Sequence, residues 1–453
     1  MAPVAAVGDT RYVDRRMEQP RHAPVDGAAD RARPEPVLTA LTGLCGRPDG
    51  PGLPPPGGVA VQVRRLAADV ERHSARLGRT VVVDPVALLV ARAELDGLRR
   101  RGPFNCGGSA RLMRSADGWI VANLARTDDW DLVDAWLQPS SPVRRGRWDS
   151  VVHGVAGQVT SHVVERAALL GLPVAAVGER GTDPSATVGA PSDLLPASTV
   201  VGVGARHSHG GAPTPALSDL MVVDLSALWA GPLASALLER AGCRVVKVES
   251  SSRPDAARHG SQPFFAMLNG GKASVSLDLD TGLGRRRLGA LVSRADVVVT
   301  AARPRALAPL GLDVDEWVGG AGTRVWLSIT GYGTGGESGH RVAFGDDAAA
   351  AGGLVVWDDR GPCFCGDAIA DPLSGLAGAA AVLEALRHGG GWAVDVAMAD
   401  VAAGCAATPA RADRDAGAHR LASGNAAHWP GSPPRVHERG ADTEVVLADL
   451  GIG

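Results

Sequence analysis

Lysine is nearly absent from this chain of 453 residues: of its 46 basic residues, only Lys247 and Lys272 are lysine, and the rest are arginine. Tyrosine is equally rare, with two copies, and aromatic residues make up 4% of the chain. The formal net charge is −3, so the chain has no basic field of the kind that holds nucleic acid. We therefore expect no nucleic-acid partner, although a local anion site is compatible with this composition.

Cysteine is also sparse, and its pattern excludes two classes of protein. The six cysteines lack the paired spacing of a disulfide framework, and Cys363-Phe364-Cys365 has no further ligands at the spacing of a zinc site. The first sixteen residues are charged and contain no apolar signal-peptide core, and no run of about 18 apolar residues occurs. We expect reduced thiols, no bound metal, no membrane contact and a cytoplasmic location.

The length predicts two or three domains at roughly 150 residues each. Apolar residues make up 45% of the chain, enough for a substantial core, and stretches rich in Gly, Pro and Ser suggest where the domains are separated. The expected parts are a disordered arm over 1–36, a small-domain-like region over 37–188, a linker over 189–216, a large domain over 217–407 and a C-terminal tail over 408–453.

The second half of the chain alternates β-branched runs with helical segments. Such alternation, with continuously apolar strands, indicates a buried and mostly parallel sheet. We predict an α/β fold, in which a doubly wound, Rossmann-like sheet forms the large domain beside a smaller α+β domain. The expected strands are 221–225, 244–249, 275–280, 296–300, 324–329 and 393–398, and the expected helices are 232–240, 282–293, 372–388 and 443–450.

The first half of the chain has a different pattern. Apolar positions at helical spacing predict two or three helices over 60–100. The Asp117-Gly118 turn signal between two short apolar runs predicts a hairpin over 111–124, and a capped helix is expected over 128–137. These elements are typical of a small α+β domain.

Ligands of open parallel sheets bind where the strands end, so the strand ends supply the first candidates. After the run MVVDLS, the segment Trp229-Ala230-Gly231-Pro232 offers backbone amides at the start of a helix. These amides could bind an anion. The same sequence is also typical of an ordinary strand-to-helix turn without a ligand. Lys247, Asn269 and Lys272 follow in the next two strand regions, where the ammonium groups would meet phosphates or form solvated surface charge.

Asp371 is the candidate nucleophile. It precedes Pro372 at the head of an alanine-rich helix, which predicts an N-cap position. A carboxylate there is either an ordinary cap or, because the helix terminus stabilises its charge, a nucleophile toward an activated acyl group. A Ser-His-Asp enzyme is disfavoured, because the chain has no G-x-S-x-G elbow.

Several segments in a fixed order resemble the family III CoA-transferases of the CaiB/BaiF type, which include formyl-CoA and carnitine CoA-transferases and the α-methylacyl-CoA racemases. The resembling segments are VVDLSALWAGPLASALLERAGCRVVKVE, FFAMLNGGKASVSLDLD, ADVVVTAARPRALAPLGLD and RVWLSITGYG. Three positions depart from the family pattern: Gly270 replaces an arginine, Ala301 an asparagine and Arg305 a glycine. The similarity covers about 217–405.

The resemblance implies an acyl-CoA:carboxylate CoA-transferase whose catalytic domain is 217–407. Asp371, four residues before Gly375, matches the family's nucleophile, and Asp367 is a rival without that glycine. The implied partners are an acyl-CoA and a small carboxylic acid, with coenzyme A as substrate, no permanently bound cofactor, and a homodimer. The implied substrate and CoA contacts are Trp229, Ala230, Gly231, Pro232, Lys247, Asn269, Lys272, Arg303 and Tyr332.

Two alternatives to a transferase stay open at this point. One is a racemase or isomerase of 2-methylacyl-CoA, but the place of that branch's histidine reads Gly345-Asp346-Asp347. The other is a non-catalytic CoA-binding subunit, suggested by Gly270 and Ala301. The segments that resemble the family's small domain come before the catalytic part, which suggests a permuted or fused chain and leaves the family's interlocked dimer undecided.

Overall fold

The structure is a computed structural model that describes residues 36–56, 58–181, 203–207, 216–408, 426–429, 431 and 433–453. The expected arm over 1–36, apart from Pro36, lies outside the described residues. Most of the expected linker over 189–216 also lies outside them.

A seven-stranded sheet forms the centre of the large domain, in the order β5-β13-β10-β9-β6-β7-β8. Six strands run parallel and β5, at one edge, pairs antiparallel with β13. The predicted mostly parallel, doubly wound α/β sheet is therefore confirmed. The strands are β5 Val203–His207, β6 Met221–Asp224, β7 Arg244–Ser250, β8 Ala273–Leu277, β9 Val297–Thr300, β10 Arg324–Thr330 and β13 Gly391–Ala397.

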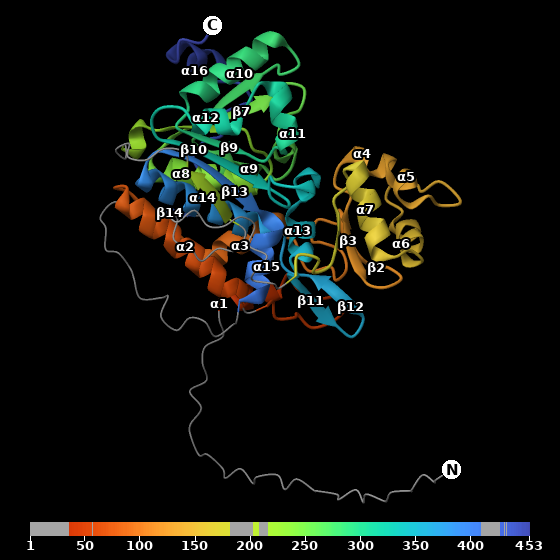
Figure 1. Ribbon diagram of the computed structural model, residues 1–453. Helices are drawn as coiled ribbons and strands as arrows, with labels where there is room; N and C mark the ends of the chain where they lie inside the picture. Colours follow the sequence, from red (N-terminus) through yellow and green to blue (C-terminus); the bar gives the residue numbers. More distant parts are fainter. Residues whose placement is uncertain are drawn as a thin grey trace, which may run out of the picture. The chain divides into compact units, whose positions relative to one another are not determined.

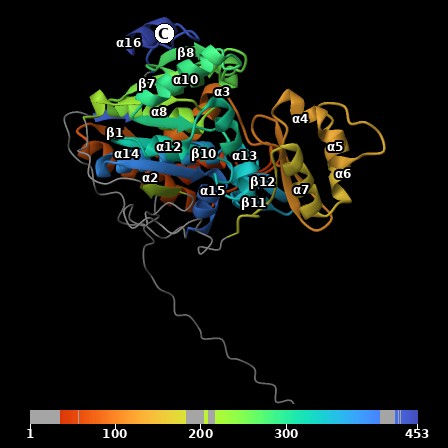
Figure 2. The same cartoon turned by 45° about the horizontal axis from the view of Figure 1, so that its top comes forward.

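Helices cover both faces of this sheet (Figures 1 and 2). Successive strand side chains point to opposite faces, so in β9 Val297 and Val299 enter one core and Val298 enters another. The first core contains α8 Ala230–Ala241, α14 Ala370–His388 and α15 Met398–Ala407. The second contains α10 Gly282–Arg294, α12 Val314–Val318 and α16 Thr443–Asp449.

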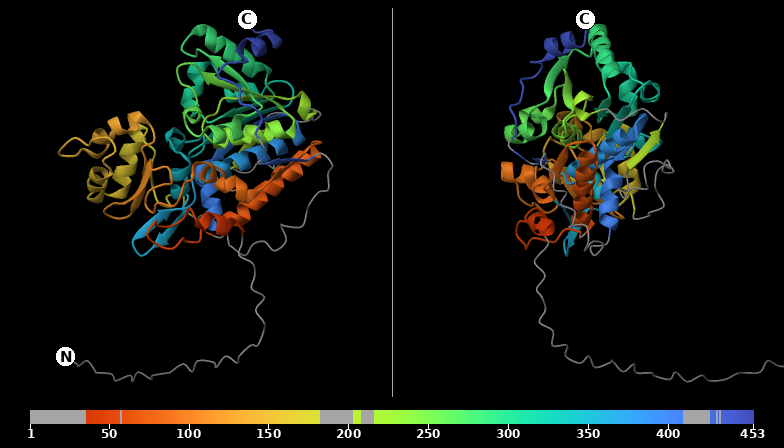
Figure 3. Two further views of the ribbon diagram at one scale, coloured as in Figure 1. Left: turned by 180° about the vertical axis from the view of Figure 1, so that it is seen from behind. Right: turned by 90° about the vertical axis from the view of Figure 1, so that its left-hand side faces the viewer.

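The N-terminal segment adds helices to the first core. These are α1 Pro36–Thr42, α2 Gly58–Arg76 and α3 Pro85–Asp96. The side chain of Gln62 in α2 donates to Thr408 Oγ1 at 2.7 Å, and Figure 3 shows α2 beside elements from the far end of the chain. A strand that we did not predict, β1 Thr80–Val83, separates α2 from α3 and pairs in parallel with β14 Ala426–Trp429.

The small domain contains a three-stranded antiparallel sheet. Its hairpin turns at Asp117-Gly118 as predicted, while the helix expected over 128–137 is divided in two at Leu132. Ile120 faces the domain's own helices, whereas Val121 on the other face joins the first core. The elements are β2 Ala110–Arg114, β3 Trp119–Asn123, β4 Val174–Ala176, α4 Thr127–Asp131, α5 Val133–Leu137, α6 Trp148–Ala156 and α7 Thr160–Leu170.

Short elements complete the described chain. They are α9 Gln262–Asn269, α11 Pro304–Leu307, α13 Gly345–Ala351 and the antiparallel hairpin of β11 Val355–Asp358 with β12 Gly361–Phe364. Across the described ranges, no helix combines the length and hydrophobicity that a membrane crossing requires.

Candidate active site

Asp371 lies inside the first turn of α14 and not at its N-cap, so that prediction is wrong by two positions. Ile369 is the N-cap, because the chain already turns at Ala368, whose φ of 45° is left-handed. The Asp371 N–H donates to the Ala368 carbonyl at 2.8 Å. Asp371 is half-buried, and its carboxylate lies in the first turn, where backbone N–H groups favour negative charge.

The Asp371 carboxylate rests on the backbone of Gly345, the first residue of α13. A Cβ atom at position 345 would lie 2.2 Å from Asp371 Oδ2 and 2.5 Å from the Ala368 carbonyl oxygen. Only glycine leaves room for this contact, and the Gly345 N–H donates to the carboxylate. The glycine therefore fixes one side of the candidate nucleophile.

Two further carboxylates surround this turn. Asp346 accepts from Asn105 Nδ2 at 2.6 Å and from the Ala368 N–H at 2.9 Å. Asp367, whose side chain is fully buried, is held in a bidentate ion pair by Arg92 of α3, with Nε–Oδ2 at 2.7 Å. Among the described residues, no group of three or more His, Cys, Asp or Glu side chains is arranged to hold a metal ion.

The surroundings of the cluster raise the pKa of two of these carboxyls. Burial raises the pKa of Asp371 to about 7, with Asp346 and Asp367 adding to the effect and Arg92 opposing it. Burial, together with the charge of Asp367, raises the pKa of Asp346 to about 6. Such values near neutrality are typical of groups that exchange protons or attack during a reaction.

Helix α8 touches α14 one turn beyond Asp371. A Cβ atom on Gly375 would lie 2.5 Å from the Ala230 carbonyl oxygen, so the Asp371-to-Gly375 spacing places the carboxylate one turn from the closest approach of the two helices. Gly231 in turn packs on Ser226, which a Cβ would meet at 2.2 Å. The structure thus brings the predicted Trp229–Pro232 turn to the helix that bears Asp371.

Trp229 connects this turn to Arg92. The guanidinium carbon of Arg92 lies 5.3 Å from the centroid of the Trp229 ring. The centroids of the Trp229 and Phe264 rings lie 4.8 Å apart in a T-shaped arrangement. Leu228, directly before it, has a φ of 68°, which is uncommon for a leucine. Backbone strain of this kind gathers at functional sites.

The two lysines are buried, contrary to both readings of the sequence. Lys272 Nζ contacts Asp224 Oδ2 at 3.0 Å and Asn269 Oδ1 at 3.1 Å, and Lys247 Nζ contacts Asp255 Oδ2 at 3.0 Å. Their exposed fractions are 2% and 1%. Because each ammonium group is enclosed by protein oxygens, it faces neither solvent nor a phosphate, and the lysines instead hold the strand-to-helix turns together.

Tyr332 and Arg303 belong to a separate region. Tyr332 is buried, and Arg341 donates to its hydroxyl at 3.1 Å while lying 3.9 Å from its ring centroid. Arg303 is partly exposed and donates to the His340 carbonyl at 3.1 Å. Neither residue joins the cluster around Asp371.

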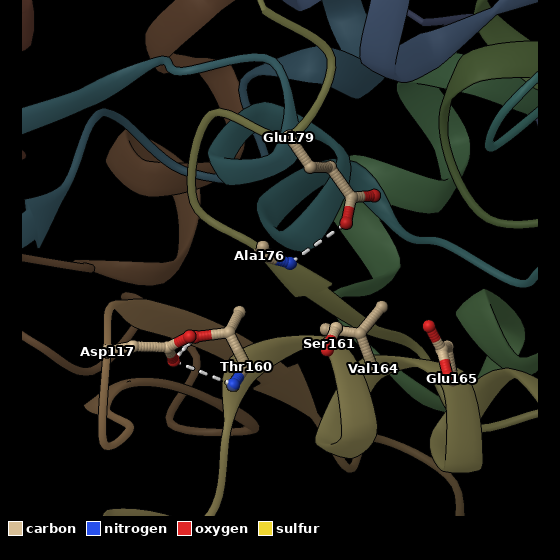
Figure 4. Close-up of a pocket in the computed structure, with 7 residues that line it drawn as sticks. All are labelled: Asp117, Thr160, Ser161, Val164, Glu165, Ala176 and Glu179. Carbon is tan, nitrogen blue, oxygen red and sulfur yellow. Dashed lines mark hydrogen bonds between the residues drawn. The ribbon is translucent and has the colours of Figure 1, made fainter.

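An open surface pocket of about 400 Å³ lies in the small domain (Figure 4). Two carboxylates of the pocket accept hydrogen bonds from nearby backbone groups. Asp117 accepts from the Thr160 N–H at 2.8 Å, and Glu179 accepts from the Ala176 N–H at 3.0 Å. The lining residues are Asp117, Thr160, Ser161, Val164, Glu165, Ala176 and Glu179. None of the candidate site residues predicted from the sequence lines it.

Sequence reasoning missed Arg92 and Asn105, the two N-terminal residues that reach the carboxylates. Arg92 is one of many arginines on amphipathic helices, so its spacing gives no signal. Asn105 lies two residues before a pair of glycines, Gly107 and Gly108, and that pair gives no signal for a contact with a distant carboxylate. Asp346 was noticed only as the place of an absent histidine.

Comparison of the sequence with known proteins shows the family of this chain. The sequence model of CoA-transferase family III matches residues 217–448, half of the chain, and the chain belongs to this family. It is 34% identical over 208 residues to a probable fatty acyl-CoA transferase of Mycobacterium tuberculosis, covering 42% of this chain and 52% of that protein. It is 30% identical over 200 residues to a succinyl-CoA–D-citramalate CoA-transferase of Chloroflexus aurantiacus, covering 41% and 50%.

The chain is also similar in sequence to solved structures. A CaiB/BaiF family protein from Brucella suis is 32% identical, with coverage of 42% of this chain and 55% of that one and a TM-score of 0.39. The chain thus spans about half the length of the relatives that it matches.

Proposed function

We propose that this protein is an acyl-CoA:carboxylate CoA-transferase in which Asp371 holds CoA as a covalent thioester. One observation carries the proposal: the half-buried Asp371, whose carboxylate lies in the first turn of α14, on Gly345 and one turn from the Ala230 contact, belongs to the part of the chain that the family model matches. The relatives named as transferases support the same chemistry. The Trp229–Pro232 turn and Arg303 are the proposed contacts with CoA.

The proposed reaction conserves atoms and charge at each step. An Asp371 oxygen attacks the thioester carbonyl and the C–S bond breaks. CoA is released as its thiolate, and the acyl group stays on Asp371 as a mixed anhydride. The thiolate then attacks the Asp371 carbonyl and releases the donor carboxylate, which leaves an aspartyl-CoA thioester. The acceptor carboxylate then attacks the aspartyl-CoA thioester, which releases CoA thiolate and forms a second mixed anhydride. The thiolate attacks the acceptor's carbonyl in that anhydride, which gives the new acyl-CoA and regenerates Asp371. Splitting the exchange in this way replaces one difficult step by easier ones.

The surrounding residues have distinct parts in this scheme. Asp371 must be ionised to attack, and Arg92 favours that form against the burial that opposes it. The Gly345 N–H steadies the carboxylate and limits the directions from which it approaches a carbonyl. The helix terminus stabilises the negative charge that returns to Asp371 in the last step, when CoA thiolate takes the acyl group from the second mixed anhydride and Asp371 leaves as a carboxylate.

The decisive experiment traps the intermediate. The protein is incubated with a panel of acyl-CoAs, quenched with hydroxylamine and digested, and fragment spectra locate any aspartyl hydroxamate. We expect it on Asp371 in the wild type and in Asp359→Asn, whose exposed carboxylate lies on the β11–β12 hairpin, but not in Asp371→Asn.

The other outcomes identify the alternatives. A hydroxamate on Asp367 would transfer the nucleophile to the rival carboxylate. No hydroxamate, together with exchange of the substrate α-proton in deuterated water, would indicate a racemase. CoA binding with neither signal would indicate a non-catalytic subunit.

We also propose that the protein is a cytoplasmic homodimer that needs no resident cofactor, and that 37–188 and 217–407 act as its small-domain-like and catalytic parts. Sedimentation velocity tests the dimer, and a single sedimenting species with the mass of one chain would contradict it. Activity of dialysed, metal-free protein tests the absence of a cofactor.

A further inference from the structure

We propose that Arg92 is a positioning residue, which holds Asp367 and the Ala368 turn in place beneath the Asp371 carboxylate. This inference rests on the proposed role of Asp371. It assigns a function in the site to α3, which lies outside the part of the chain that the family model matches.

Arg92 is fixed on two sides. Its Nε donates to Asp367 Oδ2 at 2.7 Å, while Nη2 donates to the other carboxylate oxygen, a planar fork geometry that only arginine provides. On the other side, the guanidinium carbon lies 5.3 Å from the Trp229 ring centroid. The group therefore bridges the loop before α14 and the turn before α8.

The ion pair acts on Asp371 through a short stretch of backbone. Asp367 is followed directly by Ala368, whose strained backbone accepts from the Asp371 N–H and donates to Asp346. A movement of Asp367 would therefore shift both hydrogen bonds that define the start of α14. A buried carboxylate without a cationic partner would not stay in this position, because its burial is costly.

The charges around Asp371 point the same way. The charged groups that act on it are Arg92 from α3, Asp346 from α13 and Asp367 from the loop before α14. Cys106, whose thiol lies near Asp346 and Asp367, is uncharged because burial raises its pKa. Arg92 is thus the cation among these groups, and it both pairs with Asp367 and offsets two negative charges.

The test compares Arg92→Met with Asp367→Asn. A general loss of packing would change the midpoint of the pH profile in the same direction in both variants. In Arg92→Met, we expect the midpoint of the pH profile for hydroxamate formation at Asp371 to rise by about one pH unit, which lowers the ionised fraction at pH 7 roughly fivefold. In Asp367→Asn, Arg92 loses its compensating charge, so the midpoint should fall. A merely structural effect would not move the two midpoints in opposite directions.

The plateau of the profile at high pH reports on position rather than charge. Arg92→Lys keeps the positive charge but loses the paired hydrogen bonds of the guanidinium group with Asp367. The midpoint of its pH profile should therefore stay near that of the wild type, while hydroxamate formation at high pH falls. The matched control is Arg47→Met, which breaks another bidentate pair, with Asp358 on the β11–β12 hairpin. Its profile should equal that of the wild type.

A second readout separates this inference from the proposed function. Titration of ¹³Cγ-labelled aspartate by NMR, with the Asp371 signal assigned from its loss in Asp371→Asn, follows the same midpoint without any substrate. Opposite shifts in Arg92→Met and Asp367→Asn would support the role of Arg92 even if no hydroxamate forms in the wild type. Unchanged midpoints and plateau in a folded Arg92→Met protein would overturn it.

Discussion

At the scale of single residues, the Asp371 carboxylate is held between opposing effects. Removal from water and the two neighbouring aspartates favour its protonated form, whereas Arg92 and the Gly345 N–H favour its ionised form. The balance lies near neutrality, so a modest change in one neighbour alters the charge of the group at physiological pH. The same balance affects the stability of the fold.

Replacing Asp371 by Asn should change how stability depends on pH. The pKa of Asp371 is about 7 in the folded protein and about 3.9 in an unfolded chain, so the stability that its proton contributes is complete below about pH 4 and is lost as pH rises through 7. Relative to the wild type, Asp371→Asn should gain on the order of 2–4 kcal/mol in unfolding free energy between pH 4 and pH 8. Urea unfolding at several pH values measures this difference.

The control for this prediction is Asp359→Asn, which replaces an exposed carboxylate. Its unfolding free energy should follow that of the wild type at every pH. A difference between Asp371→Asn and the wild type that stays constant with pH would show that Asp371 does not titrate differently in the folded state.

Gly345→Ala tests the contact beneath the carboxylate. The added methyl group would meet Asp371 Oδ2 at 2.2 Å and the Ala368 carbonyl at 2.5 Å, and a backbone carbonyl cannot move aside cheaply. We expect a loss of roughly 1–3 kcal/mol in unfolding free energy and a strong reduction in hydroxamate at Asp371. The control is Gly289→Ala in α10, where nothing lies within 4 Å; it should be neutral or slightly stabilising.

At the scale of elements, the crossing of α8 and α14 sets the position of the candidate nucleophile. Gly375→Ala would place a methyl group 2.5 Å from the Ala230 carbonyl oxygen and separate the helices. We expect it to lower the unfolding free energy by roughly 1–3 kcal/mol and to reduce adduct formation. Urea unfolding and the hydroxylamine assay measure these effects.

A glycine one turn further along α14 provides the comparison. In Gly378→Ala, the new methyl group meets the ends of the Leu327 and Ile329 side chains at 3.0–3.3 Å, and flexible side chains can adjust. The variant should be clearly milder than Gly375→Ala. Equal losses in both variants would mean that the Ala230 contact has no special importance.

The elements of the large domain were predictable because their signals are local. Continuous apolar runs identified β6, β9 and β10, and the helix α14 was found from its alanine-rich sequence. The strand β1 was missed, because the four residues TVVV fit a helical pattern as well as a strand. Its partner β14 lies more than 300 positions away, which no local pattern reveals.

At the scale of the whole molecule, the small sheet is tied to the site region through buried polar contacts. Asn123 at the end of β3 donates to Asp347 Oδ1 at 3.0 Å, next to Asp346 in α13. In Asn123→Leu the fully buried Asp347 loses this donor, and we expect a loss of roughly 1–3 kcal/mol in urea unfolding. The control is Arg145→Met, which breaks an exposed ion pair in the same domain and should cause no measurable change.

The residues of the candidate site also differ in whether local sequence or a distant partner determines their role. Asp371, Gly375 and the Trp229–Pro232 turn could be proposed from the sequence because each lies in a recognisable segment. Arg92 and Asn105 could not be found, because their partners are 275 and 241 positions away. The burial of Lys247 and Lys272 was also unpredictable, since it depends on aspartates that only the folded sheet brings near.

The long separation between Arg92 and Asp367 has a consequence for synthesis. A ribosome that adds roughly 5–20 residues per second needs about 15–55 s to proceed from one to the other. Throughout that interval, the loop that contains Asp367 has not been synthesised, so α3 lacks this partner. The other helices of the N-terminal segment likewise lack α14 as a packing partner. The surroundings of the Asp371 carboxylate are therefore completed late, after the 275 positions that separate Arg92 from Asp367 have been synthesised.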